Sequence, residues 1–170
     1  MTDRDRRRTL AAVTVSAAAI DLATKALATT TLDGGPVDLP GPLDLRLVHN
    51  RGIAFGFGND APVGAVLVLT LAVAGVLAVA AWRGALGGPI GAGLMLGGAL
   101  ANVADRAVGG SVVDMFDLRW WPTFNVADIF ITLGAAVLVL ASGRAAGPGD
   151  RQHEASAGGR RPNVRRPAGS

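Results

Sequence analysis

The chain has 170 residues, of which 50% are hydrophobic and 17% charged, with a mean hydropathy of +0.40 and a formal net charge of +3. This profile is typical of a membrane protein rather than a soluble domain of the same length. The absence of cysteine excludes a disulfide framework, a thiolate nucleophile and a cysteine-ligated metal.

Most of the basic residues lie at the two ends of the chain, in a basic arm at 1–9 and a segment rich in Gly, Pro and Arg at 143–170. Nucleic-acid binding is one interpretation of such arginine clusters. Next to membrane-spanning segments they more simply follow the positive-inside rule, which predicts that both termini are cytoplasmic. We expect 143–170 to be a disordered tail, because hydrophobic residues are scarce there.

Four apolar segments, at about 10–29, 62–82, 87–105 and 125–142, each approach the ~20 residues needed to cross a membrane. They predict an all-α polytopic membrane protein with four transmembrane helices in a domain spanning 10–142. The first segment could instead be a signal peptide, but it lacks a clear cleavage site and carries Asp21 and Lys25 near its far end. These two residues are four apart, so we expect them to share a helix face and neutralise each other.

Residues 31–61 are expected to form a long external loop. Every second residue of LDLRL (43–47) is leucine, and IAFGF follows Asn50-Arg51-Gly52. This pattern predicts two short strands around a turn, which would form a small extracytoplasmic β-sheet. Such a sheet could hold an extended peptide by strand addition.

Polar side chains gather in residues 97–128, within one helix end, one short loop and the next helix start. They are Asn102, Asp105, Arg106, Asp114, Asn125 and Asp128. The predicted topology brings them to the same outer side as Lys25 and Asn50. Each could simply cap a helix or reach water at the interface, but ionisable groups at membrane depth are costly and usually functional. Together they predict the active site of an intramembrane enzyme.

Two neighbouring carboxylates suit hydrolysis, because they cannot both ionise readily and so divide into a general base and a proton donor. Asp105 is adjacent to Arg106, which favours a salt bridge, and Asp117 could be merely solvated. Asp114 and Asp128 lack an adjacent cation and are the predicted catalytic pair. This chemistry needs no metal or other cofactor, although a weakly held magnesium or calcium ion is an alternative.

The motifs resemble, in order, those of lipoprotein signal peptidases, the type II signal peptidases of bacteria. They are DLATK (21–25), NRGIAFG (50–56), GGALANVADR (97–106), VVDMF (112–116) and FNVAD (124–128). The resemblance covers about residues 10–142 and implies an aspartyl endopeptidase with four transmembrane helices and cytoplasmic termini. It matches Asp114 and Asp128 with the catalytic pair. It also matches Asn50, Asn102, Arg106, Asn125, Asp21 and Lys25 with polar residues around that pair. Asp105 and Gly52 complete the set of residues expected to support the site or contact substrate.

Two positions depart from the family pattern: Ala101 stands where glycine is usual, and Met115 where phenylalanine is common. Both leave the predicted pair intact. The resemblance further implies a prolipoprotein substrate with diacylglycerol on its cysteine, cut on the N-terminal side of that cysteine at the outer face of the bacterial cell membrane. Its partners would be this substrate and membrane lipids, with no nucleic acid. We expect small residues in 52–56 to let the external loop close over the substrate.

Two other classes of function compete with the peptidase. A proton-coupled transporter or channel would have polar residues along the full membrane depth, whereas here they crowd at one end. A catalytically silent assembly subunit could associate through Gly93 and Gly97 of the third segment, since small residues at this spacing let helices approach closely. It would not explain the acid on the fourth segment.

Overall fold

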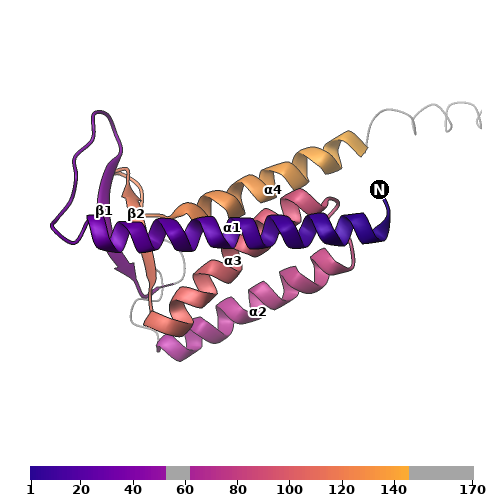
Figure 1. The fold of residues 1–170 in the computed structure, drawn as a ribbon, viewed down its shortest axis with the longest axis horizontal. Helices are drawn as coiled ribbons and strands as arrows, with labels where there is room; N and C mark the ends of the chain where they lie inside the picture. The colour runs from indigo at the N-terminus through magenta and orange to yellow at the C-terminus, as the bar shows by residue number, and fades with distance from the viewer. Residues whose placement is uncertain (53–61, 146–170) are drawn as a thin grey trace, which may run out of the picture.

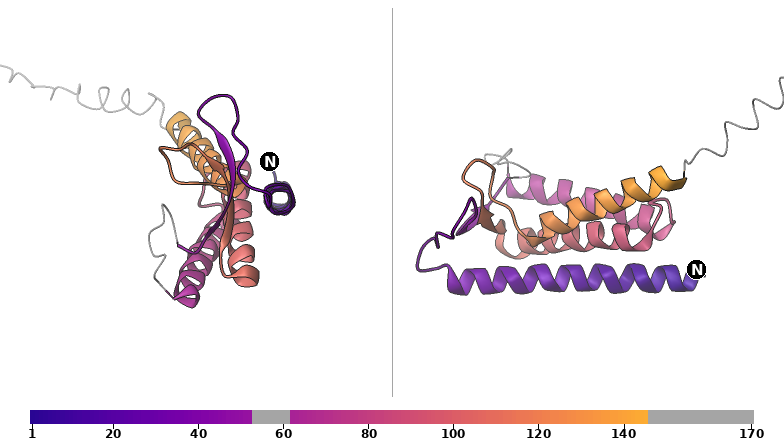
Figure 2. Two further views of the ribbon diagram at one scale, coloured as in Figure 1. Left: turned by 90° about the vertical axis from the view of Figure 1, so that its left-hand side faces the viewer. Right: turned by 90° about the horizontal axis from the view of Figure 1, so that it is seen from above.

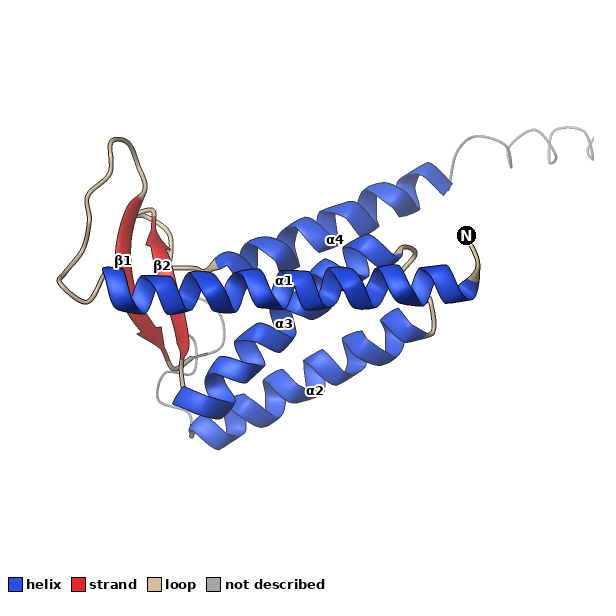
Figure 3. Cartoon of the chain, in the orientation of Figure 1, coloured by secondary structure: helices blue, strands red, loops and turns tan. Residues whose placement is uncertain are grey.

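The computed structural model describes residues 1–52 and 62–145 of the chain (Figure 1). In this part, four helices run side by side, and a two-stranded sheet lies at one end of them (Figure 3). The helices are α1 (Asp3–Thr31), α2 (Val63–Trp82), α3 (Pro89–Gly109) and α4 (Val126–Ala145). The strands are β1 (Asp44–Asn50) and β2 (Val112–Asp117).

Helix α1 begins at Asp3, well before the start expected at residue 10. Thr2 and Asp5 form a reciprocal capping box: the hydroxyl of Thr2 accepts from the backbone N–H of Asp5 at 3.2 Å, and the Asp5 carboxylate accepts from the backbone N–H of Thr2 at 3.3 Å. These bonds satisfy N–H groups that have no partner within the helix. The basic arm expected at 1–9 is therefore largely the first part of α1. Most of the tail expected at 143–170 lies outside the described residues.

Helix α3 is central, with α1 along one side of it and α4 along another (Figure 2). Glycines make both approaches close. A Cβ added at Gly97 would lie 2.6 Å from the carbonyl oxygen of Thr14 in α1, and one added at Gly98 would lie 2.5 Å from the carbonyl oxygen of Ala127 in α4. Gly93 likewise faces α1. The expected close packing of the Gly-rich helix is confirmed, and it serves contacts within this chain.

Among the helices that the structure describes, α1 and α2 are long and apolar enough to cross a membrane by length and composition. The apolar part of α4, at 126–142, is shorter. Helix α2 also turns many large apolar side chains outward, namely Val68, Leu69, Leu71, Val73, Val76 and Val79. Exposed apolar surface of this extent suits contact with lipid.

The sheet differs from the hairpin expected in the external loop. Strand β1 pairs antiparallel with β2, with Val48 opposite Asp114 and Asn50 opposite Val112. The segment VVDMF was expected to be a loop, and its assignment as a strand is a correction. The second strand expected in the external loop, IAFGF at 53–57, lies outside the described residues. The pairing places Asp114 on a strand beside the ends of the helices.

Candidate active site

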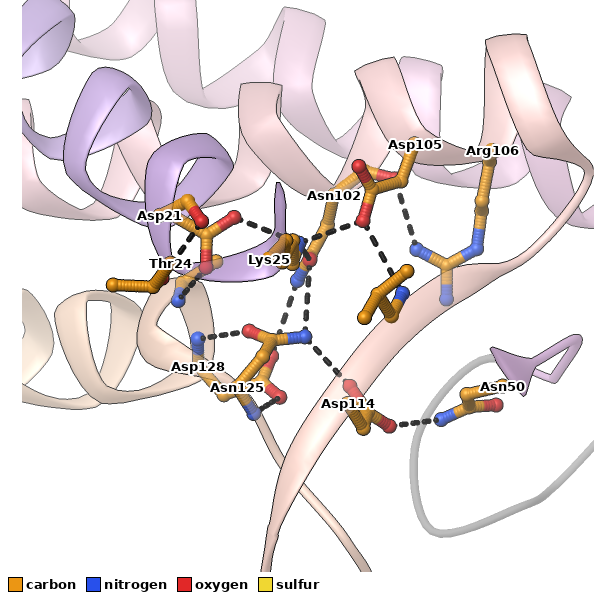
Figure 4. A network of polar contacts seen from close by, with 12 residues as sticks. Asp21, Thr24, Lys25, Asn50, Asn102, Asp105, Arg106, Asp114, Asn125 and Asp128 are labelled. Carbon is orange, nitrogen blue, oxygen red and sulfur yellow. Dashed lines mark hydrogen bonds and ion pairs between the residues drawn. The ribbon is translucent and has the colours of Figure 1, made fainter. Parts of the chain in front are cut away.

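Asp21 and Lys25 form the innermost part of a polar network at the sheet end of the helices (Figure 4). The Lys25 ammonium lies 2.7 Å from a carboxylate oxygen of Asp21, and both side chains are buried, so the pairing expected from their spacing is confirmed. The other oxygen of Asp21 accepts from the backbone N–H of Ala127 at 2.6 Å. Because N–H groups in a first helical turn lack partners within the helix, Asp21 caps α4 from α1.

Lys25 also pairs with Asp105, whose carboxylate lies 2.9 Å from the ammonium. The salt bridge expected between Asp105 and Arg106 is wrong: Asp105 pairs with Lys25 instead, because consecutive helical residues do not face each other. The buried Arg106 guanidinium instead donates to the carbonyl oxygen of Gly52 at 2.7 Å, which ties α3 to the chain after β1.

Asn102 connects Lys25 to Asp128. Its side-chain oxygen accepts from the Lys25 ammonium at 2.7 Å, and its amide nitrogen donates to a carboxylate oxygen of Asp128 at 3.1 Å. An ammonium group only donates, so it fixes which end of the amide faces α1. Lys25 thereby makes Asn102 present its N–H₂ group to Asp128.

Asn125 contacts both carboxylates of the predicted pair. Its side-chain oxygen accepts from the backbone N–H of Asp128 at 3.0 Å, while the Asp128 carboxylate accepts from the backbone N–H of Asn125 at 3.3 Å. This reciprocal cap begins α4. The amide nitrogen of Asn125 donates to Asp114 at 2.7 Å. The cap therefore also joins a carboxylate on a strand to a carboxylate on a helix.

Asp114 is 1% exposed and holds its second hydrogen bond from Asn50, whose amide nitrogen lies 3.1 Å from the carboxylate. The Asn50 side-chain oxygen accepts from the backbone N–H of Gly52 at 2.9 Å, which fixes the direction of the amide. Burial raises the pKa of Asp114 to about 6; the hydrogen bond from Asn50 opposes this shift, and the negative charge of Asp128 adds to it. Asp128 itself is half-buried.

Comparisons with known proteins identify the family of this chain. A family model described as signal peptidase (SPase) II matches residues 13–144. The chain belongs to the signal peptidase II family. It is therefore a protease, and its apolar helices are those of a membrane protein.

Several curated relatives align with most of the chain. The lipoprotein signal peptidase of Mycobacterium avium (strain 104) is 39% identical over 149 residues, which cover 81% of this chain and 80% of that protein. The lipoprotein signal peptidase of Mycobacterium tuberculosis (strain ATCC 25618 / H37Rv) is 38% identical over 149 residues, 81% of this chain and 72% of that protein. A solved structure described as a bacterial membrane enzyme covers 92% of this chain and 94% of its own, with a TM-score of 0.67 and 23% identity. This last likeness shows a shared fold.

A second polar cluster of this signal peptidase II chain lies at the far end of the sheet. Asp117, for which simple solvation was one possibility, is 9% exposed and pairs with Arg46 at 3.2 Å. Asp44 is held by the Arg119 guanidinium through contacts of 2.5 and 3.0 Å, which hold the pKa of Asp44 below its usual value. Sequence analysis missed Asp44 and Arg119, because their pairing depends on the register of β1 and β2. The cluster fixes the shape of the sheet.

A metal ion held between Asp114 and Asp128 is the alternative to a metal-free pair of carboxylates. The described ranges contain no group of three or more His, Asp or Glu side chains placed to hold a metal ion. The side-chain amides of Asn50 and Asn125 donate to Asp114, and that of Asn102 donates to Asp128 (Figure 4). The donors directed at the carboxylates are N–H groups, which suit a carboxylate pair rather than a metal centre.

Proposed function

We propose that this chain is an intramembrane aspartyl endopeptidase that removes signal peptides from diacylglyceryl-modified bacterial prolipoproteins, cutting on the N-terminal side of the lipidated cysteine. Asp114 and Asp128 are the proposed catalytic residues. The observation that carries this proposal is that Asn125 hydrogen-bonds to both carboxylates, although they come from β2 and α4. The substrate class follows from the relatives, which are named lipoprotein signal peptidases.

The two carboxylates are proposed to divide the chemistry according to their surroundings. Burial raises the pKa of Asp114 to about 6, so this side chain keeps its proton to a higher pH than an exposed aspartate. Asp128 lies in the first turn of α4, is less deeply buried, and accepts hydrogen bonds from the side chain of Asn102 and the backbone N–H of Asn125. Asp114 is then the acid and Asp128 the base.

Hydrolysis follows from these two states. Ionised Asp128 takes a proton from water as the water oxygen attacks the scissile carbonyl carbon, and Asp114 gives its proton to the carbonyl oxygen. When the tetrahedral intermediate collapses, its hydroxyl proton returns to Asp114. The C–N bond breaks as the leaving amine takes the proton held by Asp128. Both acids end in their starting states, so no other proton carrier is needed.

The proposed orientation in the membrane has α1 to α4 crossing the bilayer, both termini in the cytoplasm and the site near the extracytoplasmic face. The polar network lies at the end of the helices opposite the N terminus (Figure 1), and the first turns of α1 carry Arg4, Arg6, Arg7 and Arg8. A signal helix crossing beside α1 to α4 would end at the level of Asp114 and Asp128. Strand addition beside β1 and β2 could hold the extended segment that follows.

The distribution of the polar side chains favours a peptidase over a transporter. Helix α2 has no Asp, Glu, Lys or Arg along its length. The ionisable groups of the network in Figure 4 come from α1, α3, β2 and α4, on the side of the bundle where the sheet lies. A relay would need such groups at successive depths. A hydrolytic site at one face needs them only there.

The test is cleavage of a diacylglyceryl-modified precursor by the purified protein in detergent, with the unmodified precursor beside it. Wild type should cleave the modified precursor preferentially, Asp114→Asn and Asp128→Asn should fold and fail, and a chelator should have no effect. Asp33→Asn, which changes an exposed acid beyond the end of α1, is the matched control and should cleave normally. Full cleavage by Asp114→Asn or Asp128→Asn would remove that residue from the proposed pair.

A further inference from the structure

A further group of charged residues lies at the end of the helices remote from Asp114 and Asp128, beside the N terminus in Figure 1. There the first turns of α1 and the last turn of α2 border a hollow of about 620 Å³. Helix α1 contributes five of the lining residues, and four of them, Arg4, Arg7, Arg8 and Ala11, have the spacing i, i+3, i+4 and i+7 that puts them on one face. The lining residues are Asp3, Arg4, Arg7, Arg8, Ala11 and Trp82.

Arg6 holds the two helix ends that form this hollow. Its guanidinium donates to the carbonyl oxygen of Ala81 at 3.0 Å and to that of Trp82 at 2.9 Å. These carbonyls belong to the last turn of α2, where helix geometry supplies no partner, and the carbonyl of Ala81 also accepts from the backbone N–H of Gly84 at 3.1 Å. Leu10 packs against Ala81 on the inner side. The relative position of α1 and Trp82 is therefore fixed by hydrogen bonds and packing.

The remaining arginines of this face keep their positive charge available. The guanidinium of Arg7 lies over the Trp82 ring, 4.5 Å from its centroid, a contact that orients the group without neutralising it. Arg4 and Arg8 have no ion pair or hydrogen bond from their side chains to any residue within the described ranges. At the other end of the molecule, by contrast, Lys25 and Arg119 pair with carboxylates.

The chemistry of the lining selects the ligand. Three guanidinium groups face one carboxylate, so the hollow favours an anion, and guanidinium groups bind phosphate oxygens through paired hydrogen bonds. Trp82 is 54% exposed, and tryptophan is enriched where protein meets the membrane interface. The carboxylate of Asp3 could accept a hydroxyl group of the same ligand.

We propose that this hollow binds the headgroup of an anionic phospholipid, with the phosphate diester on Arg4, Arg7 and Arg8 and a headgroup hydroxyl near Asp3. The acyl chains would then run along the outward apolar surface of α2. This site is separate from the peptidase chemistry, and its occupancy does not depend on Asp114 or Asp128.

Native mass spectrometry of the delipidated full chain in detergent tests the proposal, with short-chain phosphatidylglycerol, short-chain phosphatidylcholine and inorganic phosphate as probes. Phosphatidylglycerol should bind saturably at one site, and the other two probes should bind at least tenfold more weakly. A basic residue near an anionic lipid surface contributes about 1 kcal/mol, or about fivefold, so Arg4→Gln/Arg7→Gln/Arg8→Gln should weaken binding about a hundredfold. Trp82→Leu keeps every charge and should weaken it by a few fold.

Arg83→Gln is the matched control, because Arg83 is exposed at the same end but does not line the hollow. Its affinity for phosphatidylglycerol should stay within twofold of wild type. Equal losses in Arg83→Gln and the triple variant would show a general charge effect and overturn the site. So would equal binding of phosphatidylcholine, equal binding of free phosphate, or unchanged affinity in the triple variant. Unchanged precursor cleavage by the triple variant would show that it is folded.

Discussion

Asp114→Asn should change stability in opposite directions at low and high pH. Burial raises the pKa of Asp114 from 3.8 to about 6. The folded state thus binds this proton more tightly than the unfolded chain, and the resulting stabilisation is complete below pH 4 and lost as pH rises through 6. A shift of about two pKa units corresponds to about 3 kcal/mol, which is the cost of keeping Asp114 ionised in the fold above pH 7.

Asparagine avoids this cost because it is neutral at every pH. It has one acceptor oxygen where the carboxylate uses two, so it loses a hydrogen bond from Asn50 or Asn125, at about 1 kcal/mol. The variant should therefore be about 2 kcal/mol more stable than wild type at pH 8 and about 1 kcal/mol less stable at pH 4.

The assay is denaturant unfolding in detergent at several pH values between 4 and 8, with Asp33→Asn as the exposed control. The quantity compared is the difference in unfolding free energy between each variant and wild type. A difference for Asp114→Asn that is the same at pH 4 and pH 8, or that changes with the opposite slope, would refute the assignment of a raised pKa to this carboxyl.

Three further substitutions test the supports of the site. Asn102→Leu keeps a similar side-chain volume and should fold, but it removes the N–H group that donates to Asp128. A hydrogen bond to a charged group contributes about 1.5–3 kcal/mol, so precursor cleavage should slow about tenfold to a hundredfold. An unchanged rate would contradict this role of Asn102. Lys25→Met leaves the carboxylates of Asp21 and Asp105 without their cation and should lower the unfolding free energy by about 3–5 kcal/mol in the same denaturant assay. An unaltered denaturation midpoint would mean that these ion pairs do not stabilise the fold. Gly98→Ala places a Cβ 2.5 Å from the carbonyl oxygen of Ala127 and should lower the unfolding free energy by about 1–3 kcal/mol, seen as a lower melting temperature. Gly109→Ala is the control, because a Cβ at Gly109 meets nothing within 4 Å. Equal melting temperatures for the two variants would contradict the close approach of α3 and α4.

Local patterns predicted much of this architecture. The apolar runs located the helices to within a few residues, except at the start of α1, where polar residues continue the helix behind a cap. The spacing of Asp21 and Lys25 predicted their ion pair because four residues make about one helical turn. The glycines of α3 also predicted a close helix contact from local sequence alone. A glycine has no side chain to hold a neighbouring helix away, so its position in the sequence marks where the helices can approach.

The errors concern contacts between distant parts of the chain. The sequence predicts a loop where β2 lies, because the partner strand β1 is more than sixty residues earlier in the chain. Adjacency in sequence pairs Asp105 with Arg106, whereas the cation that Asp105 contacts is Lys25 on another helix. Neither the cap that Asp21 gives α4 nor the pairing of Asp44 with Arg119 has a local signal. The chemical identity of the site could be predicted from residue types, but the hydrogen bonds that orient it required the fold.

The most direct test of the catalytic pair is a comparison of single-turnover cleavage rates for Asp114→Asn, Asp128→Asn and the double variant. Each single variant should lose about a hundredfold to ten-thousandfold or more, as expected when a general acid or base is removed. Because the two carboxylates are proposed to act as one unit, the double variant should be no slower than the slower single variant. Losses that multiply in the double variant, or a single variant that cleaves at the wild-type rate, would contradict the account.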